Sequence, residues 1–232
     1  MKAFLLAAGQ GTRLRPITDK VPKCLVPIRG VPMLQIWMDI CRGAGINEVL
    51  INVHAHAEIV RQWLERNPVG VQVRLAEEPT LLGSAGTVLA NRQWIGSDKF
   101  FWIFYADVLT NTSLVDMLDF HLCRQSLATL GLYEVPDPSR CGVARFDQQM
   151  VIHEFVEKPA QPRSRWAFSG VMLASSDFLD HIPSRCPVDF GFDVLPQLTG
   201  KILAYPISDY LLDVGTLPNY ELAQRSWPGL SS

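Results

Sequence analysis

Short apolar runs alternate with amphipathic segments through the first half of the chain, and this alternation limits the folds open to it. The runs at 2–6 and 49–53 are typical of strands, and a segment opened by Pro32 carries apolar residues at helical spacing between them. Gly43 and Gly45 end that helix before the next strand begins. A strand, a helix and a second strand in this order predict a parallel pair with a crossover helix, so we expect an α/β fold.

The same pattern continues downstream and changes beyond residue 135. We expect a helix around 59–64, strands at 71–75 and 100–104, and a helix at 114–122 capped between 111 and 113. The later segments predict a β-hairpin, a strand, a closing region and a C-terminal helix, at 142–146 with 151–155, 167–173, 205–214 and 216–225. The expected architecture is a doubly wound, mostly parallel mixed sheet of Rossmann-like type with a small added hairpin.

The first expected strand ends in a loop rich in glycine and positive charge. Gly9 and Gly11 allow backbone N–H groups to approach an oxygen-rich ligand. A dinucleotide-binding loop would need a third glycine where Leu14 stands, and no Gly-Lys-Ser or Gly-Lys-Thr phosphate loop is present. Four basic residues lie close to the glycines instead, namely Arg13, Arg15, Lys20 and Lys23. Together these features predict a phosphate-binding loop of another kind.

Composition argues against several other classes of protein. The 232 residues suit one large domain, and a formal net charge of -2 argues against non-specific binding to nucleic acid. The first apolar run is too short for a signal peptide or a membrane span, so we expect a cytoplasmic protein with no membrane partner. The five cysteines lack C-x-x-C spacing, which favours free thiols. We expect His54 and His56 in a strand-exit loop rather than in a metal site.

The glycine loop resembles the signature of the sugar-1-phosphate nucleotidyltransferases. The match comprises residues 6–14 with Pro16, Thr18 and the pair Pro22-Lys23. Four later segments resemble the family's motifs for the base and ribose, the sugar phosphate, the sugar and the second metal carboxylate, at 78–87, 155–159, 168–170 and 212–216. The resemblance implies one nucleotidyltransferase domain over 1–232, with 1–133 mainly binding nucleotide and 134–232 mainly binding sugar phosphate.

The resemblance also implies a role for each residue that matches a family motif. The catalytic residues would be Arg13 and Lys23. The cofactor would be Mg²⁺, which prefers carboxylate oxygens, and its ligands would be Asp107 and Asp213. The nucleotide-binding residues would be Leu6, Ala8, Gly9, Gly11, Thr12, Glu78 and Gly83. The residues that bind the sugar phosphate would be Gly142, Glu157, Lys158 and Ser169.

Three positions depart from the family pattern without removing a charge. Ala106 stands where the family usually has glycine, Cys24 where proline is frequent, and Ser169 where asparagine is common. The serine keeps hydrogen-bonding ability in a shorter side chain, and the alanine adds a methyl group next to Asp107. These departures bear on the identity of the substrate rather than on the chemistry.

The implied reaction moves a nucleotidyl group from a nucleoside triphosphate to a sugar 1-phosphate. Segments 11–18, 155–159 and 189–196 look most like guanylyltransferases acting on mannose 1-phosphate or a manno-heptose 1-phosphate, so GTP is the expected nucleotide. The alternatives are UTP, dTTP or CTP with another sugar 1-phosphate or a phosphorylated alcohol such as phosphocholine, and a non-catalytic regulatory subunit that binds nucleotide sugars. A homo-oligomer stays open, and no fused C-terminal β-helix is expected.

Overall fold

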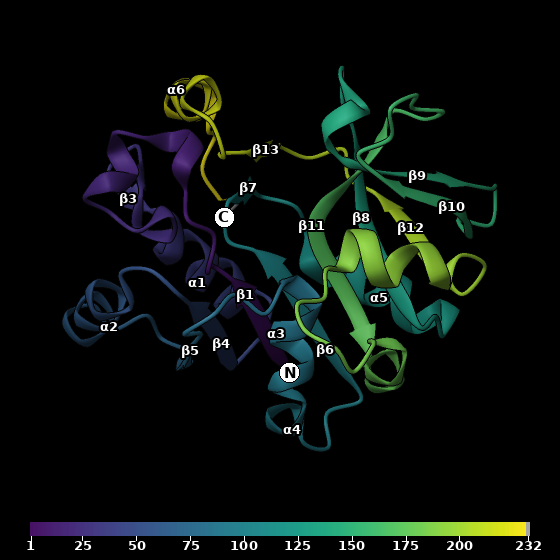
Figure 1. The fold of residues 1–232 in the computed structure, drawn as a ribbon, viewed down its shortest axis with the longest axis horizontal. Coiled ribbons are helices and arrows are strands. Elements are labelled where there is room, and N and C mark those ends of the chain that lie inside the picture. The colour runs from purple at the N-terminus through teal and green to yellow at the C-terminus, as the bar shows by residue number, and fades with distance from the viewer. Residues whose placement is uncertain (231–232) are drawn as a thin grey trace. The chain divides into compact units, whose positions relative to one another are not determined.

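The computed structural model describes residues 1–230, which form two compact units (Figure 1). Of the described residues, the first unit contains 1–81, 104–112 and 209–230, and the second contains Leu82–Ile103 and Ser113–Ser208. Both units include residues from either side of position 133, so each compact unit combines segments that are distant in sequence. The assignment of two functional halves along the chain stays a prediction.

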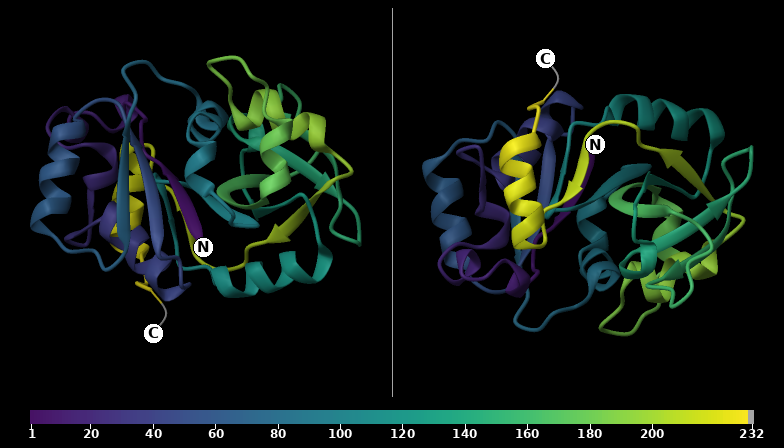
Figure 2. Two further views of the ribbon diagram at one scale, coloured as in Figure 1. Left: turned by 90° about the horizontal axis from the view of Figure 1, so that it is seen from below. Right: turned by 90° about the horizontal axis from the view of Figure 1, so that it is seen from above.

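The first unit is built on three parallel strands in the order β1-β4-β5 (Figure 2). These are β1 (Lys2–Leu6), β4 (Glu48–Val53) and β5 (Gln72–Glu77). Helix α1 (Met33–Gly43) lies in the connection from β1 to β4, and α2 (Ala57–Arg66) in the connection from β4 to β5. The predicted unit of a strand, a helix and a second, parallel strand is therefore confirmed. The helix returns the chain to the end of the sheet at which β1 began, so that the next strand can run parallel to it.

Two short antiparallel pairs complete the strands of the first unit. Strand β2 (Pro27–Ile28) pairs with β3 (Val31–Pro32), and β7 (Val108–Thr110) pairs with β13 (Leu211–Asp213). Strand β6 (Phe100–Tyr105) begins in the second unit and ends in the first. The pairing of β7 with β13 brings two segments about a hundred residues apart in sequence into contact.

Helix α6 (Leu217–Ser226) packs against the N-terminal part of the first unit, beside the purple segment in Figure 1. The Gln224 side chain donates to the Pro27 carbonyl and accepts from the Arg29 N–H, both at 2.7 Å. Apolar side chains from α1, β7 and α6 bury one another there, a cluster made of Ile28, Met33, Ile36, Leu109, Val214, Ala223 and Trp227. The C-terminal helix thus stabilises the start of the chain.

The second unit is built on five strands in the order β10-β9-β11-β8-β12. Only the β8–β12 pair is parallel, so the sheet is mixed. The strands are β8 (Ala128–Glu134), β9 (Gly142–Phe146), β10 (Ile152–Glu157), β11 (Trp166–Ser175) and β12 (Ile202–Pro206). Strands β9 and β10 form the predicted hairpin, which is therefore confirmed.

Three α-helices belong to the second unit, namely α3 (Ser84–Ala90), α4 (Arg92–Ile95) and α5 (Leu114–Arg124). Helix α5 is capped within the predicted range, since the Ser113 hydroxyl accepts from the Asp116 N–H at 3.2 Å. The same helix packs on β12 through an edge contact of Phe120 with Tyr205, whose ring centroids are 5.5 Å apart.

The expected α/β class and mixed sheet are confirmed, while some details differ from the sequence predictions. The closing region expected at 205–214 divides into the end of β12 and the separate strand β13. Within residues 1–230, no helix combines the length and apolar character that a membrane crossing requires. The structure contains no disulfide among the five cysteines, all of which lie within residues 1–230. Burial of Cys24 and Cys41 raises the pKa of each thiol to about 12.

Candidate active site

The predicted site residues fall into two groups, one in each unit. The first unit holds the residues expected to bind the triphosphate and the metal, which are Leu6, Ala8, Gly9, Gly11, Thr12, Arg13, Lys23, Glu78, Asp107 and Asp213. The second unit holds Gly83 and the residues expected to bind the sugar phosphate, which are Gly142, Glu157, Lys158 and Ser169.

The loop after β1 has a backbone conformation that explains one of its two glycines. Gly11 has a φ of +65°, and its carbonyl accepts from the Leu14 N–H at 2.9 Å and from the Thr18 hydroxyl at 2.7 Å. A Cβ on Gly11 would lie 2.9 Å from the Thr18 methyl carbon. Both the conformation and the contact therefore require glycine. Packing does not explain Gly9, because a Cβ there would meet no described atom within 4 Å.

The residues on either side of the glycines lie at the end of β1 and in the turn that follows. Leu6 is the last residue of β1, and Ala8, two residues later, is buried. Thr12 opens a single 3₁₀ turn, Thr12–Leu14, which contains Arg13. Thr12 and Arg13 are both exposed, so their side chains are accessible to a ligand.

Lys23 and Asp107 form an ion pair within the first unit. The Lys23 Nζ atom lies 2.5 Å from Asp107 Oδ2, and the side chains are 12% and 29% exposed. Asp107 lies in the turn between β6 and β7, directly after Ala106, whose N–H donates to the Leu6 carbonyl at 3.0 Å. The predicted catalytic lysine and the first predicted metal carboxylate are therefore adjacent.

Asp213 ends β13 and joins the same cluster. The Val214 N–H donates to the Asp107 carbonyl at 2.8 Å. A Cβ on Gly215 would lie 2.6 Å from Asp213 Oδ1 and 3.0 Å from an Arg13 guanidinium nitrogen, so Arg13 is next to Asp213. Burial, reinforced by the charge of Asp107, raises the pKa of Asp213 above its ordinary value, while the nearby cations oppose that shift.

The carboxylates of this cluster fit one divalent cation by their chemistry. Asp213 Oδ1 is buried and has no hydrogen-bond partner among residues 1–230, which leaves a carboxylate oxygen available as a ligand. The described chain contains no group of three or more His, Cys, Asp or Glu side chains placed to hold a metal. Two carboxylates alone cannot fill the coordination shell of Mg²⁺, so phosphate oxygens of a substrate would have to complete it. The binding of Mg²⁺ at this cluster therefore stays a prediction.

Glu78 is 4% exposed and is held by the end of β4. Its N–H donates to the Val53 carbonyl at 2.8 Å, and its own carbonyl accepts from His54 Nδ1 at 2.6 Å. The Asn52 amide donates to Glu78 Oε1 at 2.9 Å. We did not single out Asn52 from the sequence, although one amide within a buried apolar strand is a signal that could have revealed it. His54 lies at the strand exit, as expected.

In the second unit, Gly83 is required by a close backbone contact. Its φ is +80°, and a Cβ would lie 2.3 Å from the Val188 carbonyl oxygen. That oxygen accepts from the N–H groups of Ala85 and Gly86 at the start of α3, at 3.0 and 3.1 Å. The contact accounts for glycine at position 83 on structural grounds, and its predicted role in nucleotide binding stays a prediction.

Glu157 is confined by two glycines. A Cβ on Gly142 would lie 2.6 Å from Glu157 Oε2, and a Cβ on Gly191 would lie 2.2 Å from the same atom. Burial raises the pKa of Glu157; Lys158 opposes this shift and the negative charge of Asp189 adds to it. The structure thus brings Gly142 close to Glu157 and Lys158, and their role in binding sugar phosphate stays a prediction.

Two further features position this group. Lys158 has a φ of +49°, and its Nζ atom lies 5.4 Å from the centre of the Phe192 ring. Asp189 organises the turn that carries Gly191: its carboxylate accepts from the Gly191 N–H and from the Ser84 hydroxyl, both at 2.9 Å. We did not predict Asp189 or Ser84, because no local pattern joins positions about a hundred residues apart.

Ser169 is buried in β11 and makes a local hydrogen bond. Its hydroxyl oxygen accepts from the Val171 N–H at 3.1 Å, and a Cβ on Gly131 would lie 2.7 Å from that oxygen. The β11–β8 pairing is irregular between Phe168 and Met172, which includes this position. The hydroxyl therefore supports an irregular strand, and its predicted contact with sugar stays a prediction.

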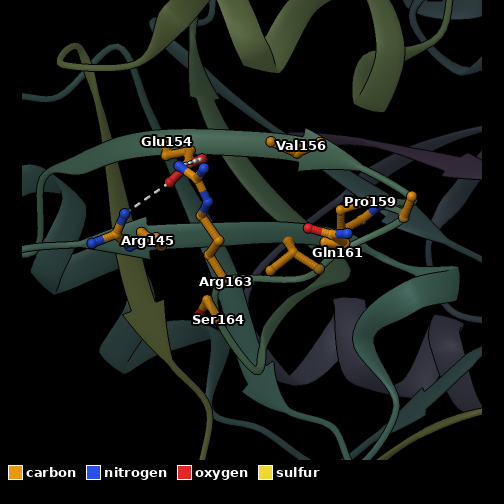
Figure 3. Close-up of a pocket in the computed structure, with 9 residues that line it drawn as sticks. Arg145, Glu154, Val156, Pro159, Gln161, Arg163 and Ser164 are labelled. Atoms are coloured by element: carbon orange, nitrogen blue, oxygen red, sulfur yellow. Dashed lines mark hydrogen bonds and ion pairs between the residues drawn. The ribbon is translucent and has the colours of Figure 1, made fainter.

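A hollow of about 180 Å³ lies on the other face of the β9–β10 hairpin (Figure 3). Val143 and Arg145 of β9 line it together with Glu154 and Val156 of β10. Glu154 and Val156 alternate along β10 with Phe155 and Glu157, whose side chains therefore point to the opposite face. The Glu154 carboxylate pairs with Arg145 at 3.0 Å and with Arg163 at 3.9 Å. The hollow is therefore separate from the group around Glu157, and its carboxylate is already paired.

The sequence is similar to known proteins along most of its length. It matches the family model described as nucleotidyl transferase over residues 2–227. A mannose-1-phosphate guanylyltransferase catalytic subunit beta from Xenopus tropicalis is 30% identical over 222 residues, covering 93% of this chain and 61% of that protein. A UTP-glucose-1-phosphate uridylyltransferase from Synechocystis sp. is 30% identical over 243 residues, covering 97% of this chain and 63% of that protein. The chain thus spans less than two thirds of the length of these relatives.

A solved structure from Bacillus anthracis, assigned as a glucose-1-phosphate thymidylyltransferase, has the same fold. Its TM-score is 0.86 at 24% sequence identity, and the match covers 97% of this chain and 94% of that chain. The family model extends over nearly all of the sequence and includes both groups of site residues. The chain therefore belongs to the nucleotidyl transferase family.

Proposed function

We propose that this protein transfers a nucleotidyl group from a nucleoside triphosphate to a sugar 1-phosphate, giving a nucleotide sugar and pyrophosphate. The observation that carries the proposal is the cluster of Arg13, Lys23, Asp107 and Asp213 beside the glycine loop. Two cations and two carboxylates from three separate segments meet there, which is the charge arrangement that phosphoryl chemistry needs.

In the proposed reaction, a phosphate oxygen of the sugar 1-phosphate attacks the α-phosphorus of the triphosphate. The bond to the bridging oxygen breaks, and the electron pair leaves with pyrophosphate. The nucleophile is already an anion near neutral pH, so no general base is required. The main difficulty is to bring two polyanions together, and positioned cations reduce that repulsion.

Each of the two cations of the cluster then has a separate task. Arg13 and the amides of the glycine loop would hold the triphosphate and stabilise the leaving pyrophosphate. Lys23, which pairs with Asp107 in the structure, would turn toward the α-phosphate and the incoming sugar phosphate. This task suits a lysine, whose flexible stem carries a compact charge.

Asp107 and Asp213 would hold Mg²⁺. When bound, the ion would neutralise charge on the phosphates and help to align them. The unpartnered Oδ1 atom of Asp213 supports this assignment, since a cation would supply the missing partner of a buried acceptor. In the second unit, Lys158 would bind the sugar phosphate and Glu157 would accept hydrogen bonds from sugar hydroxyls.

We further propose GTP as the nucleotide and mannose 1-phosphate or a manno-heptose 1-phosphate as the acceptor. The guanylyltransferase relative supports GTP, while a uridylyltransferase of equal identity shows that the family also contains proteins named for other bases. We place the reaction in the cytoplasm, because free thiols favour a reducing compartment.

A substrate matrix tests the proposal. GTP, UTP, dTTP, CTP and ATP are each combined with several sugar 1-phosphates and phosphocholine in the presence of Mg²⁺, and released pyrophosphate is measured. We expect turnover with GTP and a manno-configured sugar 1-phosphate, and none after chelation of the metal. Turnover with another pair would revise the substrates only. Nucleotide-sugar binding without turnover for any pair would instead support a regulatory subunit.

Two substitutions test the assignment of the charged cluster. Arg13→Ala and Asp107→Asn are each expected to lower kcat by about a hundredfold or more, while the far-UV circular dichroism stays native. Arg15→Ala is the matched control, because Arg15 is an exposed cation of the same loop that pairs with Asp19. Near-normal turnover in the Arg13 or the Asp107 variant would contradict the role given to that residue.

A further inference from the structure

Asn52 is a buried amide within the otherwise apolar stretch 49–53 of β4. It lies one residue before the end of β4, which is the middle strand of the three in the first unit, and it is paired in register with Leu6 of β1 and Ala76 of β5. Its exposed fraction is 4%. A polar side chain in such a place is costly unless both ends of the amide have partners.

The two ends of the Asn52 amide bind two different parts of the predicted nucleotide site. The Ala7 N–H donates to Asn52 Oδ1 at 2.7 Å, and Asn52 Nδ2 donates to Glu78 Oε1 at 2.9 Å. The orientation of the amide follows from its partners, because a backbone N–H only donates and a carboxylate only accepts. An amide supplies both the acceptor for the Ala7 N–H and the donor for Glu78 in its neutral form, whereas an ionised aspartate offers acceptors only.

Both partners are next to, or among, the residues expected to contact the nucleotide. Ala7 lies between Leu6 and Ala8 at the entry to the glycine loop. The backbone of Glu78 is already held by Val53 and His54, so the hydrogen bond from Asn52 fixes its side chain. One amide therefore sets the relation between the start of the loop and the Glu78 carboxylate.

We propose that Asn52 is a positioning residue of the nucleotide site, which holds the glycine loop and Glu78 in the geometry that accepts the nucleoside triphosphate. This inference rests on the proposed function, since the nucleotide-binding roles of Glu78 and the glycine loop belong to that proposal. It predicts a specific kinetic effect. The KM for the triphosphate and the discrimination between bases depend on Asn52, whereas the KM for the sugar 1-phosphate does not.

A reciprocal exchange of donor and acceptor tests the inference. Asn52→Asp keeps an acceptor for the Ala7 N–H but places a second carboxylate oxygen against Glu78. Glu78→Gln keeps an oxygen that accepts from Asn52. In the double variant, the introduced amide can donate to the introduced carboxylate, which restores the hydrogen bond with its direction reversed. A simple loss of packing would not be repaired in this way.

The kinetics use the nucleoside triphosphate that gives the highest wild-type kcat/KM, with pyrophosphate release as the readout. Asn52→Asp is expected to raise the triphosphate KM about tenfold or more, and to change the ratio of kcat/KM between two bases. The KM for the sugar 1-phosphate should stay within about twofold of the wild-type value. The double variant should return to within about threefold of the triphosphate KM of Glu78→Gln alone.

Binding of the triphosphate without sugar 1-phosphate, measured by calorimetric titration, gives a second readout. Thr129→Val is the matched control, because Thr129 is fully buried and its hydroxyl lies 2.8 Å from His121 Nδ1 in the second unit. This control loses a buried hydrogen bond and should bind the triphosphate normally. Asn52→Ser, which removes the reach to Glu78 without adding charge, replaces the aspartate variant should that one not fold.

The outcomes separate this inference from the function on which it rests. A wild-type protein that neither binds a triphosphate nor releases pyrophosphate overturns the proposed function and the inference with it. An active wild-type protein whose Asn52 variants keep the triphosphate KM overturns the inference alone. An equal rise of both KM values, or a similar rise in Thr129→Val, assigns Asn52 to the stability of the core and also overturns it.

Discussion

At the scale of single residues, Asp213 combines an unfavourable environment with a predicted function. Its carboxylate is largely buried, lies near Asp107, and has an oxygen without a hydrogen-bond partner among residues 1–230. Such a group costs free energy in the folded protein until a cation binds to it. Buried carboxylates in an unfavourable electrostatic environment are frequent at functional sites, where a bound cation would compensate their charge. This supports the assignment of Asp213 as a metal ligand.

Asp213→Asn is expected to stabilise the ligand-free protein while lowering turnover. The pKa of Asp213 is raised in the folded state, so the folded protein favours the protonated form. The protein loses stability as the pH rises from the ordinary carboxyl pKa to the raised pKa of folded Asp213. Above both pKa values the loss of stability reaches its full size. The variant should therefore have a higher Tm than wild type at pH 7 without metal, by a margin that shrinks as pH falls toward 4.

Asp107→Asn is the control for that measurement. Asp107 pairs with Lys23 at 2.5 Å, so loss of its charge removes a favourable interaction as well as the repulsion on Asp213. We expect no gain in Tm for this variant. A Tm of Asp213→Asn equal to or below that of wild type at pH 7 would contradict the account of Asp213.

At the scale of elements, the turn at Gly191 limits where the Glu157 side chain at the end of β10 can lie. Gly191→Ala would put a methyl group 2.2 Å from Glu157 Oε2, and the carboxylate would have to move. Backbone strain is not involved, because the φ of Gly191 is not positive. If Glu157 binds sugar hydroxyls, the KM for the sugar 1-phosphate should rise about tenfold, with the triphosphate KM nearly unchanged.

Gly43→Ala controls for the general effect of replacing glycine. A Cβ on Gly43, in the last turn of α1, would meet no described atom within 4 Å. This variant should keep both KM values and be slightly more stable, since alanine favours the helix by about 1 kcal/mol. An unchanged sugar 1-phosphate KM in Gly191→Ala would remove Glu157 from the sugar-binding residues.

Helix α5 carries a buried histidine that makes stability depend on pH. His121 is fully buried, and burial lowers its pKa from 6.5 to about 4. The folded protein favours the neutral ring, so this contribution is present above pH 6.5 and is lost as pH falls toward 4. The loss amounts to about 3 kcal/mol when complete. Denaturant unfolding at pH 7 and pH 4.5 measures most of it.

His121→Asn should lose this part of the pH dependence, although it is less stable than wild type at pH 7 because a buried side chain has been replaced. His181→Asn is the control, because His181 is exposed and should leave the slope unchanged. An identical pH dependence in wild type and His121→Asn would show that other groups cause the acid sensitivity.

Across the whole chain, the features that could be predicted from the sequence are those that depend on residues close together in it. The strands around Phe4 and Leu50, the β9–β10 hairpin and the cap at Ser113 follow from periodicity, turn residues and capping chemistry. The predicted roles of Arg13, Lys23, Asp107 and Asp213 came from a family resemblance, and the structure places these residues together.

The features that were missed depend on contacts between distant segments. Asn52 resembles any residue of an apolar strand until its partners Ala7 and Glu78 are known. Asp189 likewise shows its importance only through its contacts with Ser84 and Gly191 and its charge near Glu157. Gly83 was assigned to nucleotide binding, yet its contact with the Val188 carbonyl was not foreseen. Sequence patterns report local geometry, and these contacts arise from the way the chain folds back on itself.

The C-terminal segment from Asp209 onward belongs to the first unit, so we expect it to contribute to the stability of that unit in particular. Trp227, directly after α6, is 6% exposed, packs in the cluster with Met33 and Leu109, and its carbonyl accepts from the Arg29 guanidinium at 3.0 Å. Trp227→Ala should therefore lower the free energy of unfolding by about 3–5 kcal/mol. Leu222→Ala, in the exposed part of the same helix, is the control and should change it by less than about 1 kcal/mol.

Native-state hydrogen exchange shows where that stability is lost. Because the cluster belongs entirely to the first unit, amides of β1, β4 and β7 should exchange faster in Trp227→Ala than in wild type. Amides of β8 and β11, in the second unit, should keep their protection if the two units open separately. Equal loss of protection in both sets would mean that the chain unfolds as one cooperative body, and that the C-terminal helix stabilises the whole protein rather than the part that holds Asp107 and Asp213.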